Sequence, residues 1–262
     1  MVLPAQAQTQ PPVPHPWHRV VACLPDAAGQ MALDHALAEA VWAGRRPPTA
    51  RLYRWQTPAL TIGRHQHPEA LPCPAVRRYT GGRAVYHENE LTLSLAVPAG
   101  HPLIRPTVTA TYRAVAVPLF LALERLGLSP APGPDTPGRD RFACFAAPSR
   151  GEAMVGSHKM AAIAQRLERQ GLLVQASIPL APPSTLPGAA DSGILGLSGL
   201  LPGVTWQTLA DAVCAALHDQ LGARWVEAAP SAGERERASR LAATRYRPET
   251  GAEKPRKSAA FS

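Results

Sequence analysis

The sequence between residues 77 and 97 reads RRYTGGRAVYHENELTLSLAV and carries the clearest strand signal in the chain. Over 91–97, leucine or valine at every odd position alternates with threonine, serine or alanine, which is the period of a strand with one buried face. Residues 84–86 form a second extended run. The short polar connection between the two runs, 87–90, suits a hairpin turn. We therefore expect two neighbouring antiparallel strands here.

Three segments outside these strands have the periodicity of helices. Apolar residues recur at helical spacing over 30–42, and Gly44 follows as a stop signal. A long helix is indicated over 108–126, with Gly127 at its end. A last helical region begins after Thr205, a residue type suited to cap a helix N-terminus.

Short strands and loops complete the pattern. Residues 51–53 and 59–62 look like strands, whereas 128–141 and 182–204 have the composition of loops. Because strands are mixed with helices and no regular βαβ order appears, the sequence predicts an α+β fold.

The 262 residues fit one large domain, and 45% hydrophobic residues are enough to fill a core. We expect a disordered N-terminal arm over 1–16, one folded domain over 17–247 and a basic C-terminal tail over 248–262. No apolar run reaches the roughly eighteen residues of a membrane span, and the N-terminus lacks a signal-peptide pattern. We therefore expect a soluble, cytoplasmic protein.

The formal net charge of +8 is compatible with two classes of partner. Basic chains bind nucleic-acid phosphates, but here the arginines are spread along the chain without a zinc finger, basic helix or aromatic RNA-binding signature. A positive field also attracts acidic proteins and speeds their encounter. The charge alone leaves both partner classes open.

Residues 77–87 form a basic, glycine-bearing loop that enters a strand. The paired Gly81 and Gly82 let a backbone lie close to a ligand, because no Cβ blocks the approach. Neighbouring arginines and free N–H groups could hold a phosphate or carbonyl there. The same composition also fits an ordinary turn with solvated charges, and it matches no phosphate-loop pattern.

The chain has four cysteines with no CxxC pair among them: Cys23, Cys73, Cys144 and Cys214. We therefore expect neither a metal site nor a disulfide framework. Cys144 opens the run CFAAPS, and nearby cations such as Lys159 or Arg141 would favour a thiolate able to take an acyl group from a thioester. The alternative is a small buried hydrophobe. Lys159 itself, between small and apolar residues, is suited to polarise a carbonyl, although most lysines are simply solvated.

Taken in their order along the chain, the motifs over about residues 17–180 resemble the lipoate-protein ligase and octanoyltransferase family. The catalytic domain of that family shares its fold with biotin protein ligases. The matching segments are 31–34, 51–53 with Trp55, 76–87, 90–92, and Lys159 with Ala164 and Gln165. The resemblance implies a mixed β-sheet flanked by helices. Within the family, the run at 144–149 looks like the mark of the branch that works through a cysteine acyl-enzyme.

The resemblance implies transfer of an octanoyl or lipoyl group from acyl carrier protein to a lysine of a lipoyl-domain protein. Cys144 would carry the acyl group, and Lys159 would bind the thioester carbonyl oxygen. The implied substrate-binding residues are Arg77, Arg78, Thr80, Gly81, Gly82, Arg83, Ala84, Val85, His87, Ala162, Ile163 and Ala164. The acceptors would be the glycine cleavage H protein or 2-oxoacid dehydrogenase subunits. Neither a cofactor, a metal, a nucleic acid nor a membrane is implied.

Two alternatives stay open. One is an ATP-dependent lipoate-protein ligase, although many such ligases have a small accessory domain where we expect only the basic tail. The other is a non-catalytic relative that binds an acyl group or a partner. It is made credible by Ala162-Ile163 where the family usually has Gly-Ser, and by Ala176 where the family tends to have histidine. Arg83 and Ala84 likewise stand where a third glycine is common.

Overall fold

The computed structural model describes residues 15–68, 70–134, 142–147 and 151–250, and its centre is a six-stranded sheet. The strands of this sheet are β1 His15–Val20, β2 Thr49–Tyr53, β6 Glu90–Pro98, β10 Ala162–Glu168, β11 Gly171–Pro179 and β12 Ala223–Glu227. Their order is β10-β11-β6-β2-β1-β12. The first four pair antiparallel, whereas β2, β1 and β12 pair parallel. The expected mixed sheet is therefore confirmed.

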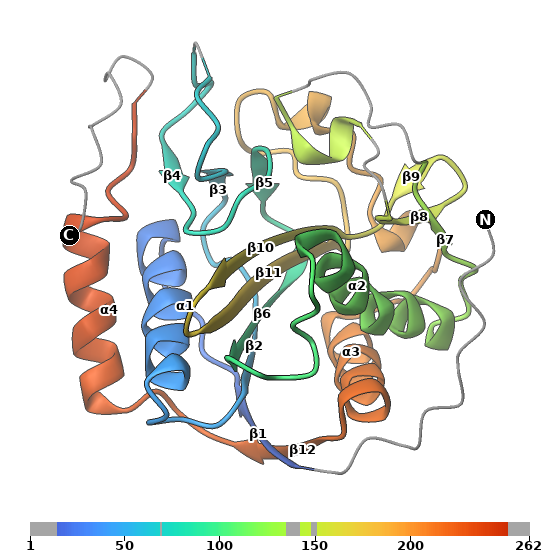
Figure 1. Cartoon of the computed structure of the whole chain (residues 1–262). Helices are drawn as coiled ribbons and strands as arrows, with labels where there is room; N and C mark the ends of the chain where they lie inside the picture. The colour runs from blue at the N-terminus through green and yellow to red at the C-terminus, as the bar shows by residue number, and fades with distance from the viewer. Residues whose placement is uncertain (1–14, 69, 135–141, 148–150, 251–262) are drawn as a thin grey trace.

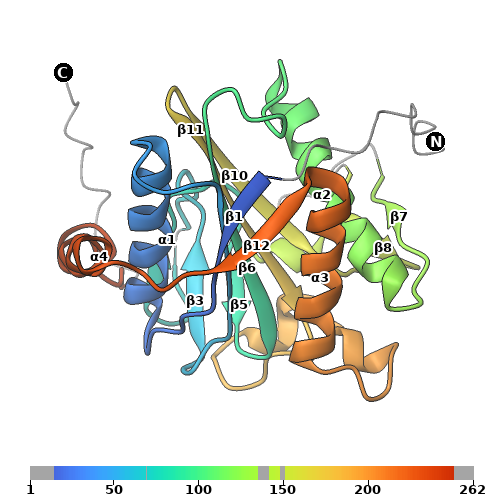
Figure 2. The same ribbon diagram turned by 90° about the horizontal axis from the view of Figure 1, so that it is seen from below.

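Helices cover both faces of this sheet (Figures 1 and 2). Helix α1 (Ala27–Trp42) packs on one face with α4 (Ala232–Thr244) outside it, and α2 (Val108–Arg125) and α3 (Trp206–Leu221) cover the other. The three helices expected from periodicity are confirmed. None of the helices in the described ranges is long and apolar enough to cross a bilayer.

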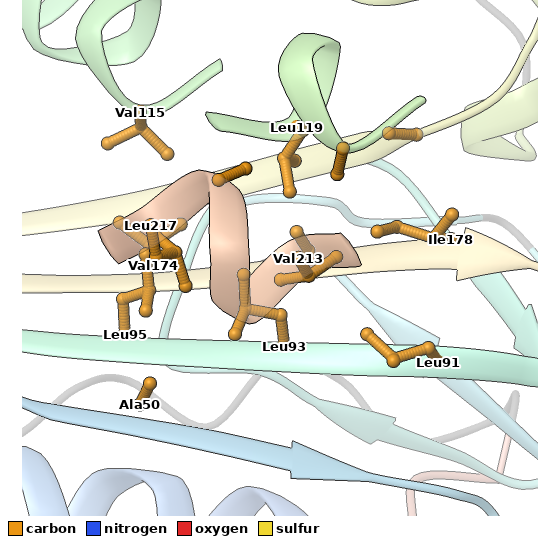
Figure 3. Packing of buried hydrophobic residues seen from close by; sticks show 14 of the residues in the cluster. Ala50, Leu91, Leu93, Leu95, Val115, Leu119, Val174, Ile178, Val213 and Leu217 are labelled. Atoms are coloured by element: carbon orange, nitrogen blue, oxygen red, sulfur yellow. The ribbon is translucent and has the colours of Figure 1, made fainter. Parts of the chain in front are cut away.

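Strand β6 is buried on both faces, so the expected buried face is confirmed and the face with the polar side chains is covered as well. Its leucines point toward α2 and α3 and join the core cluster of Figure 3, which includes Ala50, Val115, Leu119, Val174, Ile178, Val213 and Leu217. On the opposite face Ala96 packs against Ala38 and Val41 of α1. A central strand with helices on both sides has no solvent face, even where its alternate residues are polar.

The expected hairpin between residues 84–86 and β6 does not form. Strand β5 (Val85–His87) instead pairs antiparallel with β3 (Ala59–Ile62), which also pairs with β4 (Ala75–Arg77), in a separate three-stranded sheet. The connection between β5 and β6 is tied to the end of β11, because the Asn89 carbonyl accepts hydrogen bonds from the N–H groups of Leu180 and Ala181. The chain thus passes from one sheet to the other, and the interior between them is where the pocket described below lies.

A third, smaller sheet carries part of the candidate site. It contains β7 (Ala131–Pro132), β8 (Ala153–Val155) and β9 (His158–Lys159). The 3-10 helices η1 (Cys144–Ala146), η2 (Ala189–Ser192) and η3 (Leu197–Gly199) lie in the connections, so the segments 128–141 and 182–204, as far as they are described, are mostly loop.

The elements that were not expected from the sequence include β1, β12 and α4. His15 and Pro16, assigned to the arm, are the first residues of β1, and residues 1–14 lie outside the described ranges. Beyond α3 the chain is more than a basic tail, because β12 extends the sheet and α4 packs on α1. Glu249, assigned to the tail, forms a backbone bridge with Ala75, and residues 251–262 are again outside the description.

Candidate active site

Cys144 is held in place by the glycine-bearing loop. The Ala84 N–H donates to the Phe142 carbonyl over 3.1 Å, and the Cys144 N–H donates to the Ala84 carbonyl over 2.7 Å. Because of these two bonds, the segment around Cys144 lies parallel to the end of the glycine-bearing loop, with a bridge between Ala84 and Ala143. The Cys144 side chain remains partly exposed and free of any disulfide. Residues 148–150, which include the Pro-Ser part of the CFAAPS run, lie outside the described ranges.

Lys159 reaches the cysteine from the small β8–β9 sheet. Its Nζ lies 3.1 Å from Cys144 Sγ, 3.0 Å from the Cys144 carbonyl oxygen and 2.5 Å from Glu152 Oε1. The lysine side chain is almost fully buried, and so is that of Glu152. Because a buried ammonium is costly without an anionic partner, the Glu152 carboxylate explains how this charge is tolerated inside the protein.

A mostly apolar pocket of about 400 Å³, open mouth included, adjoins this pair. Eight predicted residues line it: Arg78, Gly82, Val85, His87, Cys144, Ala162, Ile163 and Ala164. Six more come from α1, β2, β6 and β11: Met31, Tyr53, Thr92, Gln175, Ala176 and Ser177.

The Arg78 guanidinium shapes the loop that forms one wall of the pocket. It donates to Thr61 Oγ1 over 2.7 Å and to the carbonyls of Gly81 and Arg83 over 2.9 and 2.8 Å. Burial lowers the pKa of Arg78 to about 10, so the group stays charged at neutral pH. Gly82 has φ of 89°, a conformation that L side chains rarely adopt. The loop is thus fixed by its own arginine.

His87 and Glu90 form a hydrogen-bonded wall deeper in the pocket. His87 stacks on Trp55 at 4.0 Å between ring centroids, and its two nitrogens contact Glu90 Oε1 at 2.8 Å and Thr61 Oγ1 at 2.7 Å. Burial alone would raise the pKa of Glu90, but His87 and hydrogen bonds from Thr92 and Ser177 outweigh it and lower that pKa. The carboxylate therefore stays ionised, and the wall is rigid.

Buried polar groups also tie α1 to the sheet beneath the loop. Asp34 accepts from Arg51 Nη1 over 2.6 Å and from Gln175 Nε2 over 2.7 Å, while Thr80 Oγ1 donates to Gln175 Oε1 over 2.7 Å. The matched segments 31–34 and 51–53 thus meet in space. The hydrogen bond between Asp34 and Arg51 joins α1 to β2 and so supports the site structurally.

Not every predicted residue reaches the pocket. Arg77 points elsewhere, forms an ion pair with Glu249 over 2.7 Å and donates to the Gly63 carbonyl over 3.0 Å. Four others of the glycine-bearing loop are not among the lining residues: Thr80, Gly81, Arg83 and Ala84. Thr80 and Ala84 act on the site indirectly, through the hydrogen bonds given above.

Sequence reasoning missed Glu152 and Gly63. Glu152 pairs with Lys159, and the only signal for it was an acidic residue seven positions before a candidate lysine. Gly63 lies directly under the backbone of Gly82, where a side chain has no room. Among the described residues, no group of three or more His, Cys, Asp or Glu side chains is placed to hold a metal ion.

Comparisons with known proteins agree with this fold. Octanoyltransferase LipM of Kyrpidia tusciae is 39% identical over 170 residues, which cover 59% of this chain and 62% of that protein. The chain therefore matches about six tenths of the length of this curated relative. A structure of lipoate-protein ligase A bound with ATP superposes with a TM-score of 0.72 at 19% identity, covering 88% of this chain and 95% of that one.

An archaeal neighbour gives the same fold. The structure of a bi-partite lipoate protein ligase and its E2 lipoyl domain from Thermoplasma acidophilum matches with a TM-score of 0.69 at 19% identity, covering 88% of this chain and 93% of that one. The family model of the lipoyl protein ligase A/B catalytic domain matches residues 26–184, which is more than half of the chain. The chain belongs to the lipoyl protein ligase A/B catalytic-domain family.

Proposed function

We propose that this chain is an octanoyltransferase that moves an octanoyl group from a carrier thioester to a lysine of a lipoyl-domain protein. The observation that carries the proposal is the contact of 3.1 Å between Lys159 Nζ and Cys144 Sγ, beside an apolar pocket. A sulfur that accepts from a buried ammonium is suited to act as a thiolate nucleophile.

In the first half-reaction the Cys144 sulfur attacks the carbonyl carbon of the donor thioester. A bond forms between that carbon and Cys144, the bond to the donor sulfur breaks, and the cysteine proton ends on the released donor thiol. One thioester replaces another of similar energy, so the step needs no ATP. Lys159 stabilises the negative charge that develops on the carbonyl oxygen.

In the second half-reaction the ε-amine of the acceptor lysine attacks the acyl-enzyme. A carbon–nitrogen bond forms, the bond to Cys144 breaks, and the proton lost by the amine returns to the sulfur. An amide is more stable than a thioester, so the transfer is downhill. Lys159 serves the same oxygen again, because both half-reactions pass through a tetrahedral intermediate at the same carbon.

The acyl chain would lie against the small residues of β10. Ala162 packs in one apolar cluster with Val85 and Phe145, next to Cys144. Gly82 and Ala164 both line the pocket, and the position of a Cβ on Gly82 lies 3.7 Å from the Ala164 methyl, so the two small residues lie close together and form one continuous wall. The chain would lie along this wall.

Acidic partner proteins fit the charge of the chain. Acyl carrier proteins and lipoyl domains are typically acidic, and a net charge of +8 favours their encounter. The archaeal neighbour is described with an E2 lipoyl domain, which supports the same class of acceptor. We include the glycine cleavage H protein and 2-oxoacid dehydrogenase subunits in this proposed class, with a cytoplasmic location.

Intact mass after mixing with octanoyl-acyl carrier protein, with and without ATP, tests the proposal. The parent protein should gain one hydroxylamine-labile octanoyl group without ATP, and Cys144→Ala should not. Cys73→Ala is the matched control, because this partly exposed cysteine lies outside the pocket lining. An adduct that persists in Cys144→Ala contradicts the cysteine route. Transfer of free lipoate only with ATP would identify a ligase, and neither reaction would identify a binding protein.

A further inference from the structure

We infer that Glu152 is a positioning residue of the acyl-transfer site, which holds the Lys159 ammonium in place and aimed at the reacting carbonyl. The inference rests on the proposed function and adds a residue to it. Neither the sequence patterns nor the comparisons assign any role to Glu152.

The Lys159 ammonium has an acceptor for each of its hydrogen-bond donors. A lysine ammonium has three N–H groups. In this site its three contacts are Cys144 Sγ at 3.1 Å, the Cys144 carbonyl oxygen at 3.0 Å and Glu152 Oε1 at 2.5 Å. The Cys144 carbonyl and the Glu152 carboxylate accept from Lys159 in every state of the reaction. Only the contact to the Cys144 sulfur is lost once that sulfur is acylated.

Acylation of Cys144 frees the Lys159 N–H that had contacted the sulfur, and this N–H is then available to the substrate. When Cys144 becomes a thioester, its sulfur is a poor acceptor and the new carbonyl oxygen lies two bonds away, on the carbon attached to the sulfur. The ammonium can turn this N–H to that oxygen while Glu152 and the Cys144 carbonyl hold the other two. Preorganised donors of this kind lose little free energy to reorientation during the reaction, which is the basis of oxyanion stabilisation.

Burial makes the ion pair between Lys159 and Glu152 strong. The side chains of Lys159 and Glu152 are 1% and 4% exposed. A buried ammonium is costly without an anionic partner that accepts its N–H, and the Glu152 carboxylate supplies both. Among the residues that the structure describes, Cys144 on η1 and Tyr112 on α2 are titratable groups that interact with this pair.

Tyr112 completes the arrangement on the far side of Glu152. Burial first, and then the charges of Glu152 and Cys144 and a hydrogen bond to Glu152, raise the pKa of Tyr112 far above its ordinary value. The phenol therefore stays protonated beside the Glu152 carboxylate.

Single-turnover acylation by octanoyl-acyl carrier protein, followed by mass, tests the role of Glu152. Glu152→Gln should slow acylation at least roughly tenfold, less than loss of the donor itself, which costs about a hundredfold or more. Glu152→Asp, which keeps a carboxylate on a shorter side chain, should recover part of the rate.

Glu234→Gln is the matched control. It breaks another little-exposed ion pair, that of Arg46 and Glu234 at 2.7 Å, outside the pocket. It should lower stability and keep the parental acylation rate. If the parent protein fails to acylate at Cys144, the proposed function fails. If the parent acylates and folded Glu152→Gln keeps its rate, the role of Glu152 is overturned. Should Glu152→Gln not fold, a parental rate in Glu152→Asp, whose shorter side chain draws the carboxylate away from Lys159, would overturn it equally.

Discussion

A Cβ built on Gly63 lies 1.8 Å from the carbonyl oxygen of Gly82 and 2.6 Å from its carbonyl carbon. The glycine-bearing loop therefore rests directly on the backbone that follows β3. Gly63 has no positive φ, so the reason for glycine here is space and not backbone conformation. Because Gly82 lines the pocket, the absence of a side chain at Gly63 sets how far the loop stands from β10.

We expect Gly63→Ala to destabilise the protein by about 1–3 kcal/mol, since the clash is with backbone atoms that must shift. Its acylation rate should fall as well, because the loop wall moves. Gly81→Ala is the control: a Cβ there meets nothing within 4 Å and φ is not positive, so stability should change by less than about 0.5 kcal/mol. Urea unfolding of both variants decides this. Equal stability of the two variants would mean that the loop is not seated on Gly63.

For Lys159→Ala we expect an acylation rate lower by a factor of about a hundred or more, the cost of removing an oxyanion donor. The variant also leaves Glu152 buried without its cation, which should cost about 3–5 kcal/mol of stability. Lys159→Met combined with Glu152→Gln removes both charges and should regain stability without regaining acylation. Thermal unfolding and single-turnover mass measurements separate the two effects. A parental rate in either variant would show that the lysine is no donor to the substrate.

Two buried histidines give the protein a stability that depends on pH. Burial, and in second place the charge of His15, lowers the pKa of His101 to about 4. Burial likewise lowers the pKa of His35 to about 4, with Glu39 opposing it. The unfolded chain takes up these protons near the ordinary value of 6.5. Because the unfolded state binds more protons between those values, stability should fall as pH drops from about 6.5 toward 4.

The expected loss in this window is up to about 1.4 kcal/mol per pH unit for each histidine. His101→Asn keeps an acceptor for the Leu103 N–H and should flatten the dependence, although the absolute stability falls. His67→Asn changes an exposed histidine and should leave the slope unchanged. Urea unfolding at several pH values between 4.5 and 7 measures the slopes. The same slope in parent and His101→Asn would show that His101 is protonated in the folded state.

The elements that the sequence predicted are those with local signals. Helices α1 and α3 have apolar periodicity and side-chain caps at Asp26 and Thr205, and β3 was found with its observed bounds. Strand β1 pairs with β12, about two hundred residues later, and only that distant pairing makes a strand of a run containing Pro16. The hairpin prediction failed for the same reason, since β5 pairs with β3 and not with its neighbour in sequence.

Helix α4 shows a signal that was available and not used. Its sequence is rich in arginine and glutamate, and only Ala238 and Leu241 are buried, so periodicity is weak. The Ser231 and Glu234 side chains, however, form a capping box, a pattern readable from sequence alone. In the site, the motifs placed Cys144 and Lys159 together. The contact between Glu152 and Lys159 was not predicted, because only the pairing of β8 with β9 brings the two residues together.

The last prediction concerns Ile163, which lines the pocket and also belongs to the core cluster beneath α2 and α3. On the sheet it lies beside Ala176 of β11, which in turn pairs with Leu93 of β6. The large side chain of Ile163 thus adjoins the small one of Ala176. Because protein interiors are close-packed, the branched side chain takes up room that a longer or bulkier acyl group would need.

We therefore expect the parent protein to prefer octanoyl over the dithiolane-bearing lipoyl group, and Ile163→Ser to relax that preference. One or two methylenes of fit correspond to about 1–3 kcal/mol, so the preference should be tens to a few hundredfold. Ile163→Ser will also lower stability, so Ile178→Ser is the control, the same change in the same core cluster but outside the pocket lining. It should lower stability and keep the preference. Competition between the two acyl donors measures the ratio, and equal transfer of both by the parent, unchanged in Ile163→Ser, would show that Ile163 points away from the acyl chain.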